Sequence, residues 1–184
     1  IFETLKKEFN FDFSYFKFFA GHSLGEYSAL VCSDSLKFED ALYLLHQRGK
    51  AMQEAVPVGQ GSMLAILGTK IDEIKELIAH NLDKDDVCEI ANDNAEGQVI
   101  ISGKKKSVVR IEKVLKEKKI KSIQLKVSAP FHCSLMKPAA EYMANKINNV
   151  EFKIPNHGVI SNVTADPVTD PEIIKKFLIQ QIYS

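Results

Sequence analysis

The strongest chemical signal in the sequence is a serine between two glycines, in the stretch Gly21-His22-Ser23-Leu24-Gly25. An apolar, aromatic run over Tyr15–Ala20 precedes this stretch, and a segment of helical character through Cys32 follows it. A strand that turns sharply into a helix holds a serine hydroxyl clear of the backbone, and glycines leave room for such a turn. Unpaired N–H groups at the start of the helix favour negative charge beside the serine. The pattern predicts a nucleophile at Ser23, although a tight turn without chemistry would use the same glycines.

A second candidate is an arginine on the apolar face of a helix predicted from Phe38 to Ala55. Apolar residues recur at helical spacing along this segment, at Ala41, Leu44, Leu45, Met52 and Ala55. Arg48 falls in the middle of that stripe, where an unpaired guanidinium would be costly. The residues leave two interpretations open. In the first, Arg48 has a structural role and either pairs within the protein or extends to the surface. In the second, Arg48 binds a substrate carboxylate through two hydrogen bonds.

A third candidate is His132, in the stretch Ala129-Pro130-Phe131-His132-Cys133-Ser134. This stretch follows an alternating strand predicted over Ser122–Ser128 and precedes a helix predicted from Pro138 to about Asn148. Catalytic side chains of α/β proteins commonly lie at strand ends. Position alone therefore predicts either a general base at His132 or a histidine that caps a helix or packs in the core.

Charge and cysteine content exclude several classes of function. Lysines and arginines number 24, as do aspartates and glutamates, so nothing indicates binding to nucleic acid or to an anionic membrane. No apolar run approaches a membrane span, and no signal peptide is visible. Cys32, Cys88 and Cys133 lack metal or disulfide spacing, so we expect no metal site and a cytoplasmic location.

The predicted elements between residues 58 and 127 follow the order β-α-β-β-α-β, which is typical of a ferredoxin-like subdomain. They are a strand over Ser62–Leu67, a helix capped by Thr69, strands over Val87–Ala91 and Gln98–Ser102 joined by the polar loop Asn92–Gly97, a helix over Val108–Lys118 and the strand over Ser122–Ser128. The lysines at 104–106 and 116–121 are interpreted as solvated faces, or more weakly as a docking site for an acidic partner.

The flanking segments predict a larger α/β unit around this insert. Residues 1–57 carry the serine turn and the arginine helix, whereas residues 128–184 carry His132, a strand over Gly158–Asn162 and a helix from Pro171. We expect an α/β fold with a parallel-sheet, α/β-hydrolase-like core and the inserted ferredoxin-like (βαββαβ) subdomain.

Together these stretches resemble the malonyl-CoA:acyl carrier protein transacylases of type II fatty acid synthesis. The matching stretches, in the family's order, are Gly21–Leu30, Gln47–Gln53, Gly61–Met63, Asn92–Asn94 with Gly97–Val99, and Ser128–Pro138. The resemblance implies a truncation at both ends. The family's N-terminal Gly-Gln-Gly-Ser segment, with the second oxyanion donor, is absent, and the segment that orients the histidine would lie beyond Ser184.

The resemblance also implies roles for individual residues. Ser23 would carry the malonyl group as an ester, His132 would move the proton, the Leu24 N–H would stabilise the oxyanion and Arg48 would bind the malonyl carboxylate. His22, Met52 and Met63 would contact substrate, and Asn92, Asn94 and Gln98 would lie near the pantetheine path. No bound cofactor is implied, because the carrier protein supplies the phosphopantetheine. The implied partners are acyl carrier protein and a coenzyme A thioester, and the implied state is a monomer.

Three other functions stay open. An esterase or thioesterase of the α/β-hydrolase type would use the same serine turn, but it would give Arg48 no role. The chain could instead be a catalytically incomplete fragment that only binds carrier protein. A related acyltransferase domain of a large synthase is the third possibility.

Overall fold

The computed structural model describes residues 1–184, and their contacts divide the chain into two units. The first unit contains Ile1–Gln47 and Asn145–Gln181, and the second contains Arg48–Ala144 and Ile182–Ser184. The predicted division into residues 1–57, 58–127 and 128–184 uses other boundaries than these two units, and it stays a prediction.

The first unit holds a three-stranded sheet in the order β1-β6-β7, formed by β1 (Phe18–Ala20), β6 (Gly158–Ile160) and β7 (Pro167–Val168). Strands β1 and β6 are parallel and pair Ala20 with Ile160, whereas β7 runs antiparallel to β6. The carboxyl ends of β1 and β6 therefore lie side by side at one edge of the sheet.

The helices and turns of this unit are α1 (Phe2–Glu8), the 3-10 turn η1 (Phe13–Tyr15), α2 (Gly25–Cys32), the first part of α3 (Phe38–Glu54) and α7 (Pro171–Gln180). Helix α2 ends at the predicted Cys32, and α3 and α7 begin at the predicted Phe38 and Pro171. Helix α7 starts where predicted because the Asp170 carboxylate accepts hydrogen bonds from the N–H groups of Glu172 and Ile173, and Pro171 occupies the first turn.

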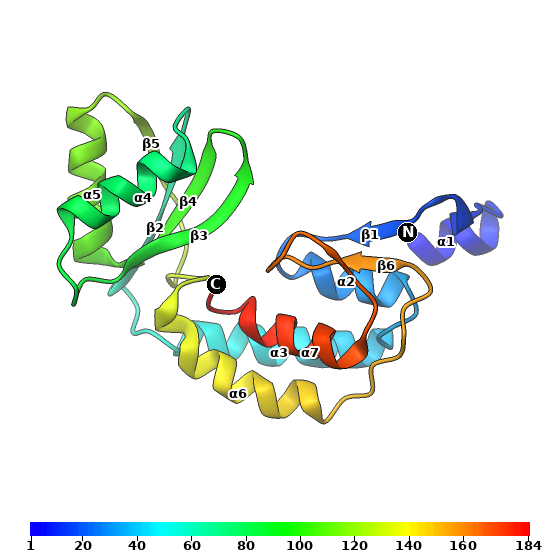
Figure 1. The fold of residues 1–184 in the computed structure, drawn as a ribbon. Helices are drawn as coiled ribbons and strands as arrows, with labels where there is room; N and C mark the ends of the chain where they lie inside the picture. The colour runs from blue at the N-terminus through cyan, green and yellow to red at the C-terminus, as the bar shows by residue number, and fades with distance from the viewer. The chain divides into compact units, whose positions relative to one another are not determined.

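The second unit contains a four-stranded antiparallel sheet in the order β3-β4-β2-β5 (Figure 1). Its elements are β2 (Gly61–Leu67), α4 (Ile71–Asn81), β3 (Cys88–Ala95), β4 (Gln98–Lys104), α5 (Lys105–Glu117) and β5 (Lys121–Gln124), followed by the 3-10 turn η2 (Ser134–Met136) and α6 (Lys137–Asn148), whose last residues belong to the first unit. This order of strands and helices is the ferredoxin-like arrangement, so the predicted α/β fold with an antiparallel subdomain is confirmed.

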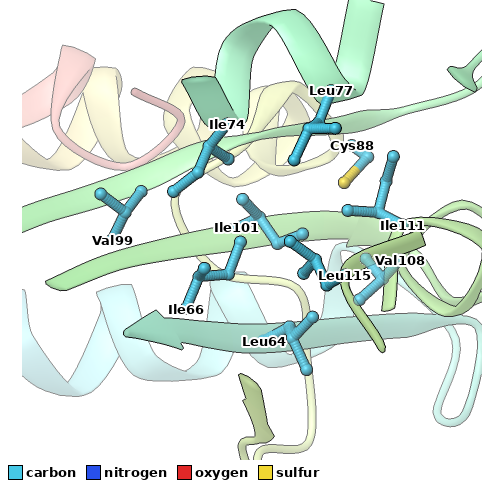
Figure 2. Packing of buried hydrophobic residues seen from close by; sticks show 10 residues of the cluster. All are labelled: Leu64, Ile66, Ile74, Leu77, Cys88, Val99, Ile101, Val108, Ile111 and Leu115. Atoms are coloured by element: carbon cyan, nitrogen blue, oxygen red, sulfur yellow. The ribbon is translucent and has the colours of Figure 1, made fainter. Parts of the chain in front are cut away.

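Helices α4 and α5 pack on one face of this sheet and enclose an apolar core between helices and strands (Figure 2). The buried side chains are Leu64, Ile66, Ile74, Leu77, Cys88, Val99, Ile101, Val108, Ile111 and Leu115. Because side chains alternate across a strand, Met63 and Ala65 of β2 point to the opposite face. There they form a smaller cluster with Ala91 and Ile100, against which Leu125 and Phe131 pack.

Several predicted element boundaries are wrong. Helix α5 starts at Lys105 instead of Val108, and β6 ends at Ile160 instead of Asn162. Residues Asn92–Ala95 continue β3 instead of forming a loop, since the connection to β4 is only Glu96-Gly97 and Gly97 adopts a φ of +74°. Strand β5 ends at Gln124, and Val127 is exposed because no strand pairs with it. Helix α4 starts at Ile71 without a side-chain cap, so Thr69, which is buried, does not cap it. Only the last part of the aromatic run over Tyr15–Ala20 is a strand, since Tyr15 ends a 3-10 turn.

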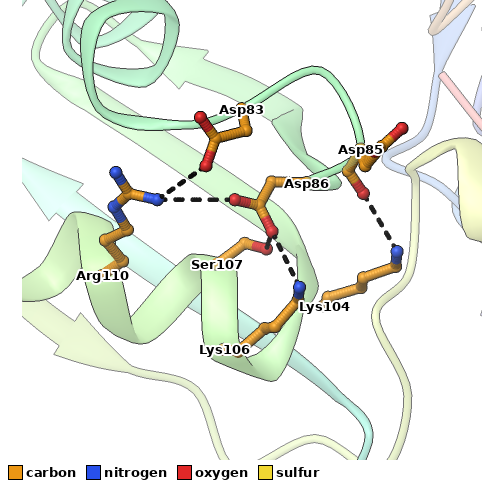
Figure 3. Close-up of polar contacts among 7 residues, drawn as sticks. All are labelled: Asp83, Asp85, Asp86, Lys104, Lys106, Ser107 and Arg110. Carbon is orange, nitrogen blue, oxygen red and sulfur yellow. Dashed lines mark hydrogen bonds and ion pairs between the residues drawn. The ribbon is translucent and has the colours of Figure 1, made fainter.

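Lysines at the junction of β4 and α5 contact residues of the loop between α4 and β3 (Figure 3). Lys104 donates to the backbone oxygen of Asp85, and Lys106 lies 3.2 Å from the Asp86 carboxylate. The hydrogen bond from Lys106 lowers the pKa of that carboxyl group. Arg110 also reaches Asp83 and Asp86. Lys106 therefore pairs with a carboxylate and Lys104 with a neutral carbonyl oxygen, and docking of an acidic partner stays a prediction. No helix of the structure is both long enough and apolar enough to cross a membrane.

Candidate active site

The predicted strand–turn–helix around Ser23 is confirmed. Strand β1 ends at Ala20 and α2 begins at Gly25. The turn closes through hydrogen bonds from the Gly25 N–H to the His22 oxygen at 2.8 Å and from the Glu26 N–H to the Ser23 oxygen at 3.1 Å. Ser23 itself has a φ of +51°, a left-handed conformation that costs a residue with a side chain roughly 1–3 kcal/mol. Such a strained turn places a side chain at the tip between strand and helix, as a nucleophile requires.

Gly21 is required at its position by close backbone contact. A Cβ atom on residue 21 would lie 2.0 Å from the Gly25 oxygen, inside any allowed contact distance. A Cβ atom on Gly25 would meet nothing within 4 Å. Of the two glycines in the predicted motif, only Gly21 is therefore needed to make room for the turn.

The residues on either side of Ser23 are exposed. Leu24 is 58% exposed and forms the N-cap of α2, and its N–H makes no hydrogen bond within the chain. A free N–H at a helix start beside the nucleophile is the arrangement that stabilises an oxyanion. His22 is also exposed and precedes the tip of the turn.

Asn162 bridges the serine turn with its side-chain amide. The Ser23 N–H donates to Asn162 Oδ1 at 2.6 Å, and Asn162 Nδ2 donates to the Gly21 oxygen at 2.8 Å. One side chain thus pairs with the backbone on both sides of His22. The bridge satisfies two polar groups that the sharp turn removes from strand pairing.

Two buried polar residues lie behind this bridge. Glu26, which is 3% exposed, accepts hydrogen bonds from the Asn162 N–H at 3.2 Å and from Gln181 Nε2 at 2.6 Å. Gln181, which is 2% exposed and follows α7, also donates from Nε2 to the backbone carbonyl oxygen of Ser23 at 3.1 Å. The first unit therefore holds the serine turn through side chains from α2, from the end of β6 and from the end of α7.

Sequence reasoning missed Asn162, Glu26 and Gln181 as functional candidates. A signal for Asn162 was present, since a strand was predicted over Gly158–Asn162 and polar residues at the carboxyl ends of parallel strands meet at one edge. Nothing in the pattern of α7 distinguishes Gln181, because its role depends on where the helix ends in space.

His132 lies in the second unit, in the loop between β5 and α6. It is 7% exposed and has a φ of +56°, so it too sits in a left-handed turn. Glu89 of β3 anchors this loop, because its carboxylate accepts hydrogen bonds from both the N–H of Ser134, at 2.8 Å, and the Ser134 hydroxyl. On the other side, Cys133 Sγ donates to the Pro130 oxygen at 3.2 Å. Burial raises the pKa of the Cys133 thiol, as expected for a cysteine that packs in the interior.

Arg48 and Met52 lie one turn apart on the buried face of α3. Arg48 is 7% exposed and Met52 is 3% exposed, at the spacing predicted for the stripe. Met63 of β2 is 4% exposed and belongs to the cluster on which Phe131 packs. The structure thus brings Met63 and the residue before His132 to the same face of the sheet.

The three residues predicted near the pantetheine path all lie on the β3–β4 hairpin. Asn92 and Asn94 are in β3, next to irregular positions in its pairing with β4, and Gln98 starts β4 opposite Ala95. Asn94 and Gln98 are exposed, and Asn92 is half-buried. Their position on one hairpin is shown, and their contact with pantetheine stays a prediction.

Comparisons with known proteins agree with these features. The acyl transferase domain family matches residues 17–182. The malonyl CoA-acyl carrier protein transacylase of Bacillus subtilis is 45% identical over 168 residues, which cover 91% of this chain and 53% of that protein.

Solved structures give the same result. An acyl carrier protein S-malonyltransferase from Vibrio cholerae superposes with a TM-score of 0.93 at 40% identity, covering 100% of this chain and 59% of that one. A malonyl-transacylase in complex with a type II PKS acyl-carrier protein gives a TM-score of 0.92 at 36% identity, covering 100% and 58%. The chain spans about half the length of the curated relatives that it matches. On this evidence the chain belongs to the acyl transferase domain family, and its relatives there are malonyl CoA-acyl carrier protein transacylases.

Proposed function

We propose that the protein transfers a malonyl group from malonyl-CoA to the phosphopantetheine thiol of an acyl carrier protein. The observation that carries the proposal is the left-handed Ser23 at a strand–helix turn, within a chain that matches the acyl transferase domain over residues 17–182. The named function of the relatives supplies the substrate class. Because the chain spans about half the length of those relatives, the transfer reaction itself is a proposal.

The reaction proceeds in two balanced halves. The Ser23 hydroxyl attacks the malonyl thioester carbon while His132 takes the hydroxyl proton, and the Leu24 N–H stabilises the oxyanion. The C–S bond then breaks, coenzyme A leaves as a thiol with the proton from His132, and a malonyl-serine ester remains. In the second half, His132 takes the proton of the pantetheine thiol, and the sulfur attacks the ester carbon. The bond between that carbon and Ser23 Oγ then breaks, the malonyl thioester of the carrier protein leaves, and His132 returns the proton to Ser23 Oγ.

The remaining site residues provide binding. Arg48 binds the malonyl carboxylate through its planar, two-donor edge. Met52 and Met63 line the acyl pocket, His22 contacts the substrate, and Asn92, Asn94 and Gln98 lie along the pantetheine path. The proposal needs no bound cofactor, since the carrier protein brings the phosphopantetheine. The solved complex of a related malonyl-transacylase with its carrier protein supports this choice of partner.

A brief pulse of malonyl-CoA, followed by intact-mass measurement, tests the proposal. We expect a malonyl adduct on the protein that is absent in Ser23→Ala and that disappears when carrier protein is added and gains the group. His132→Ala should slow adduct formation by about 10²–10⁴-fold, the usual contribution of a general base. His80→Ala is the matched control, because His80 is an exposed histidine at the end of α4.

Three results would overturn the proposal. Release of free malonate without any acceptor would indicate a hydrolase. Binding of carrier protein without any adduct would indicate an interaction fragment. An adduct that persists in Ser23→Ala would place the nucleophile on another residue.

A further inference from the structure

We propose that Asn162 is a positioning residue for Ser23, and that its side-chain amide holds the serine turn in the conformation that reacts. The inference rests on the proposed role of Ser23 as nucleophile. Asn162 acts through the backbone of the turn and does not itself react.

The geometry of the bridge is specific to a carboxamide. Asn162 must accept from the Ser23 N–H through Oδ1 and donate to the Gly21 oxygen through Nδ2, at 2.6 Å and 2.8 Å. Only a side chain with one acceptor and one donor on the same planar group can make both bonds. The two bonded backbone groups flank His22, so the bridge fixes the chain on both sides of the residue that leads into the left-handed Ser23.

The position of Asn162 is itself held from behind. Its N–H donates to the buried carboxylate of Glu26, and the same carboxylate accepts from Gln181 Nε2. Gln181 Nε2 also lies 3.5 Å from Asn162 Oδ1 and 3.1 Å from the Ser23 oxygen. Buried polar groups that are bonded on several sides form a rigid support, because each lost bond leaves an unsatisfied partner.

The bridge also separates the two N–H groups of the turn. The Ser23 N–H is already used by Asn162, whereas the Leu24 N–H makes no hydrogen bond within the chain. The bond to Asn162 therefore occupies the Ser23 N–H and leaves the Leu24 N–H as the backbone donor beside the nucleophile. A shift of the turn by about 1 Å is enough to reduce a rate by roughly 10²-fold.

A labelling rate tests this inference without reference to malonyl transfer. The probe is an uncharged alkyl fluorophosphonate, which reacts with an activated serine and needs neither Arg48 nor a carrier protein. We expect Asn162→Ala to reduce the rate of labelling at Ser23 by about 10²-fold. In malonyl transfer the same variant should lower kcat and leave the KM for malonyl-CoA within about twofold, since the loss lies in the chemical step.

Asn156→Ala is the matched control. Asn156 lies in the same unit and donates from Nδ2 to Asp34 at 2.8 Å, but its bond joins other loops. Its labelling rate should equal that of the unsubstituted protein. Equal rates in Asn162→Ala and Asn156→Ala would overturn the inference.

Asn162→Asp separates positioning from a general loss of structure. An ionised carboxylate accepts from the Ser23 N–H but repels the Gly21 oxygen, whereas a protonated carboxyl group has the donor and acceptor pattern of the amide. The labelling rate, taken as a ratio to the unsubstituted protein at the same pH, should rise as the pH falls from about 7 toward about 4, the ordinary pKa of aspartate. A ratio that stays flat over this range would contradict the proposed role of the Nδ2 donor.

The outcomes distinguish this inference from the proposed function. Labelling at Ser23 that depends on Asn162, in a protein that forms no malonyl adduct, would support the positioning role and reject the substrate. No labelling at Ser23 in the unsubstituted protein would reject both, because Ser23 would then not be a nucleophile.

Discussion

A left-handed serine is held in place by one asparagine from a distant strand end. Ser23 adopts a φ of +51°, which an isolated serine disfavours. The two hydrogen bonds between the Asn162 side chain and the turn offset part of that strain, since each contributes about 0.5–1.5 kcal/mol. The left-handed turn is thus a property of Ser23 together with its surroundings and not of the Gly-x-Ser-x-Gly pattern alone.

Arg48 belongs to the same scale, because one guanidinium is proposed to select the acyl group. We expect Arg48→Ala to reduce kcat/KM for malonyl-CoA about ten- to a hundredfold more than kcat/KM for acetyl-CoA, since hydrogen bonds to a charged group contribute about 1.5–3 kcal/mol. Arg48→Lys should fall between the two, because a lysine keeps the charge and loses the two-donor edge. Steady-state rates with the two thioesters provide the measurement, and an equal loss for both would mean that Arg48 is structural.

At the scale of elements, two pairings present the candidate residues. The parallel pairing of β1 with β6 brings the carboxyl end of one strand next to that of the other, which places Asn162 beside the serine turn. In the second unit, β3 presents Glu89 to the loop that carries His132. A polar side chain thus stabilises a left-handed turn in both units, from the turn after β6 in the first and from within β3 in the second.

Removal of the Glu89 anchor should loosen the His132 loop. Glu89→Ala deletes both hydrogen bonds to Ser134 and leaves the Ser134 N–H without its acceptor, so we expect the free energy of unfolding to fall by about 1.5–3 kcal/mol. Ser134→Ala should cost less, since it removes only the hydroxyl bond. Urea unfolding curves measure the difference, with Glu96→Ala in the exposed β3–β4 turn as the control. A midpoint for Glu89→Ala equal to that of the control would show that the anchor contributes nothing.

At the scale of the whole molecule, each unit has its own supporting structure. The second unit has a dry core on one face of its sheet, and the first has the polar network around Ser23. Ser23 belongs to the first unit, and His132 and Arg48 belong to the second.

A buried thiol in the core of the second unit should lower the free energy of unfolding as the pH rises above 9. Burial raises the pKa of the Cys88 thiol from 9.0 to about 12. Between these two values the unfolded chain releases the thiol proton while the folded chain keeps it, so stability is full below pH 9 and falls as the pH rises, by at most about 1.4 kcal/mol per pH unit. Unfolding free energies at several pH values above 9 should decline less steeply in Cys88→Ala than in the unsubstituted protein. Parallel declines would show that Cys88 does not contribute.

Local patterns were sufficient for the elements and for the candidate residues that lie within a motif. The spacing around Ser23 predicted a strand, a turn and a helix, and the apolar stripe of α3 predicted its buried face, on which Arg48 lies. The order of elements from β2 to β5 predicted the ferredoxin-like sheet. These features succeed because neighbouring residues control backbone conformation, and periodicity reports which face is buried.

Polarity misled the prediction where a strand end is exposed. Residues Asn92–Ala95 read as a loop from their side chains, yet they pair with β4 because the hairpin turn needs only Glu96 and Gly97. The alternation up to Ser128 likewise read as a strand, although β5 ends at Gln124 and only one further backbone hydrogen bond to β2 follows, from the Leu125 N–H to the Met63 oxygen. Strand pairing is decided by the availability of a partner, which a single segment does not encode.

The support of the nucleophile was decided only in the tertiary structure. Asn162 lies 139 residues from Ser23 along the chain, and Gln181 lies 158 residues away. Their contacts with the serine turn require the parallel register of β1 with β6 and the position at which α7 ends. Neither the residue types nor their spacing in the sequence predicts that these side chains reach the turn. The sequence thus identified the residue proposed to react, whereas long-range packing selected the residues that hold it, because a hydrogen bond depends on position in space and not on separation along the chain.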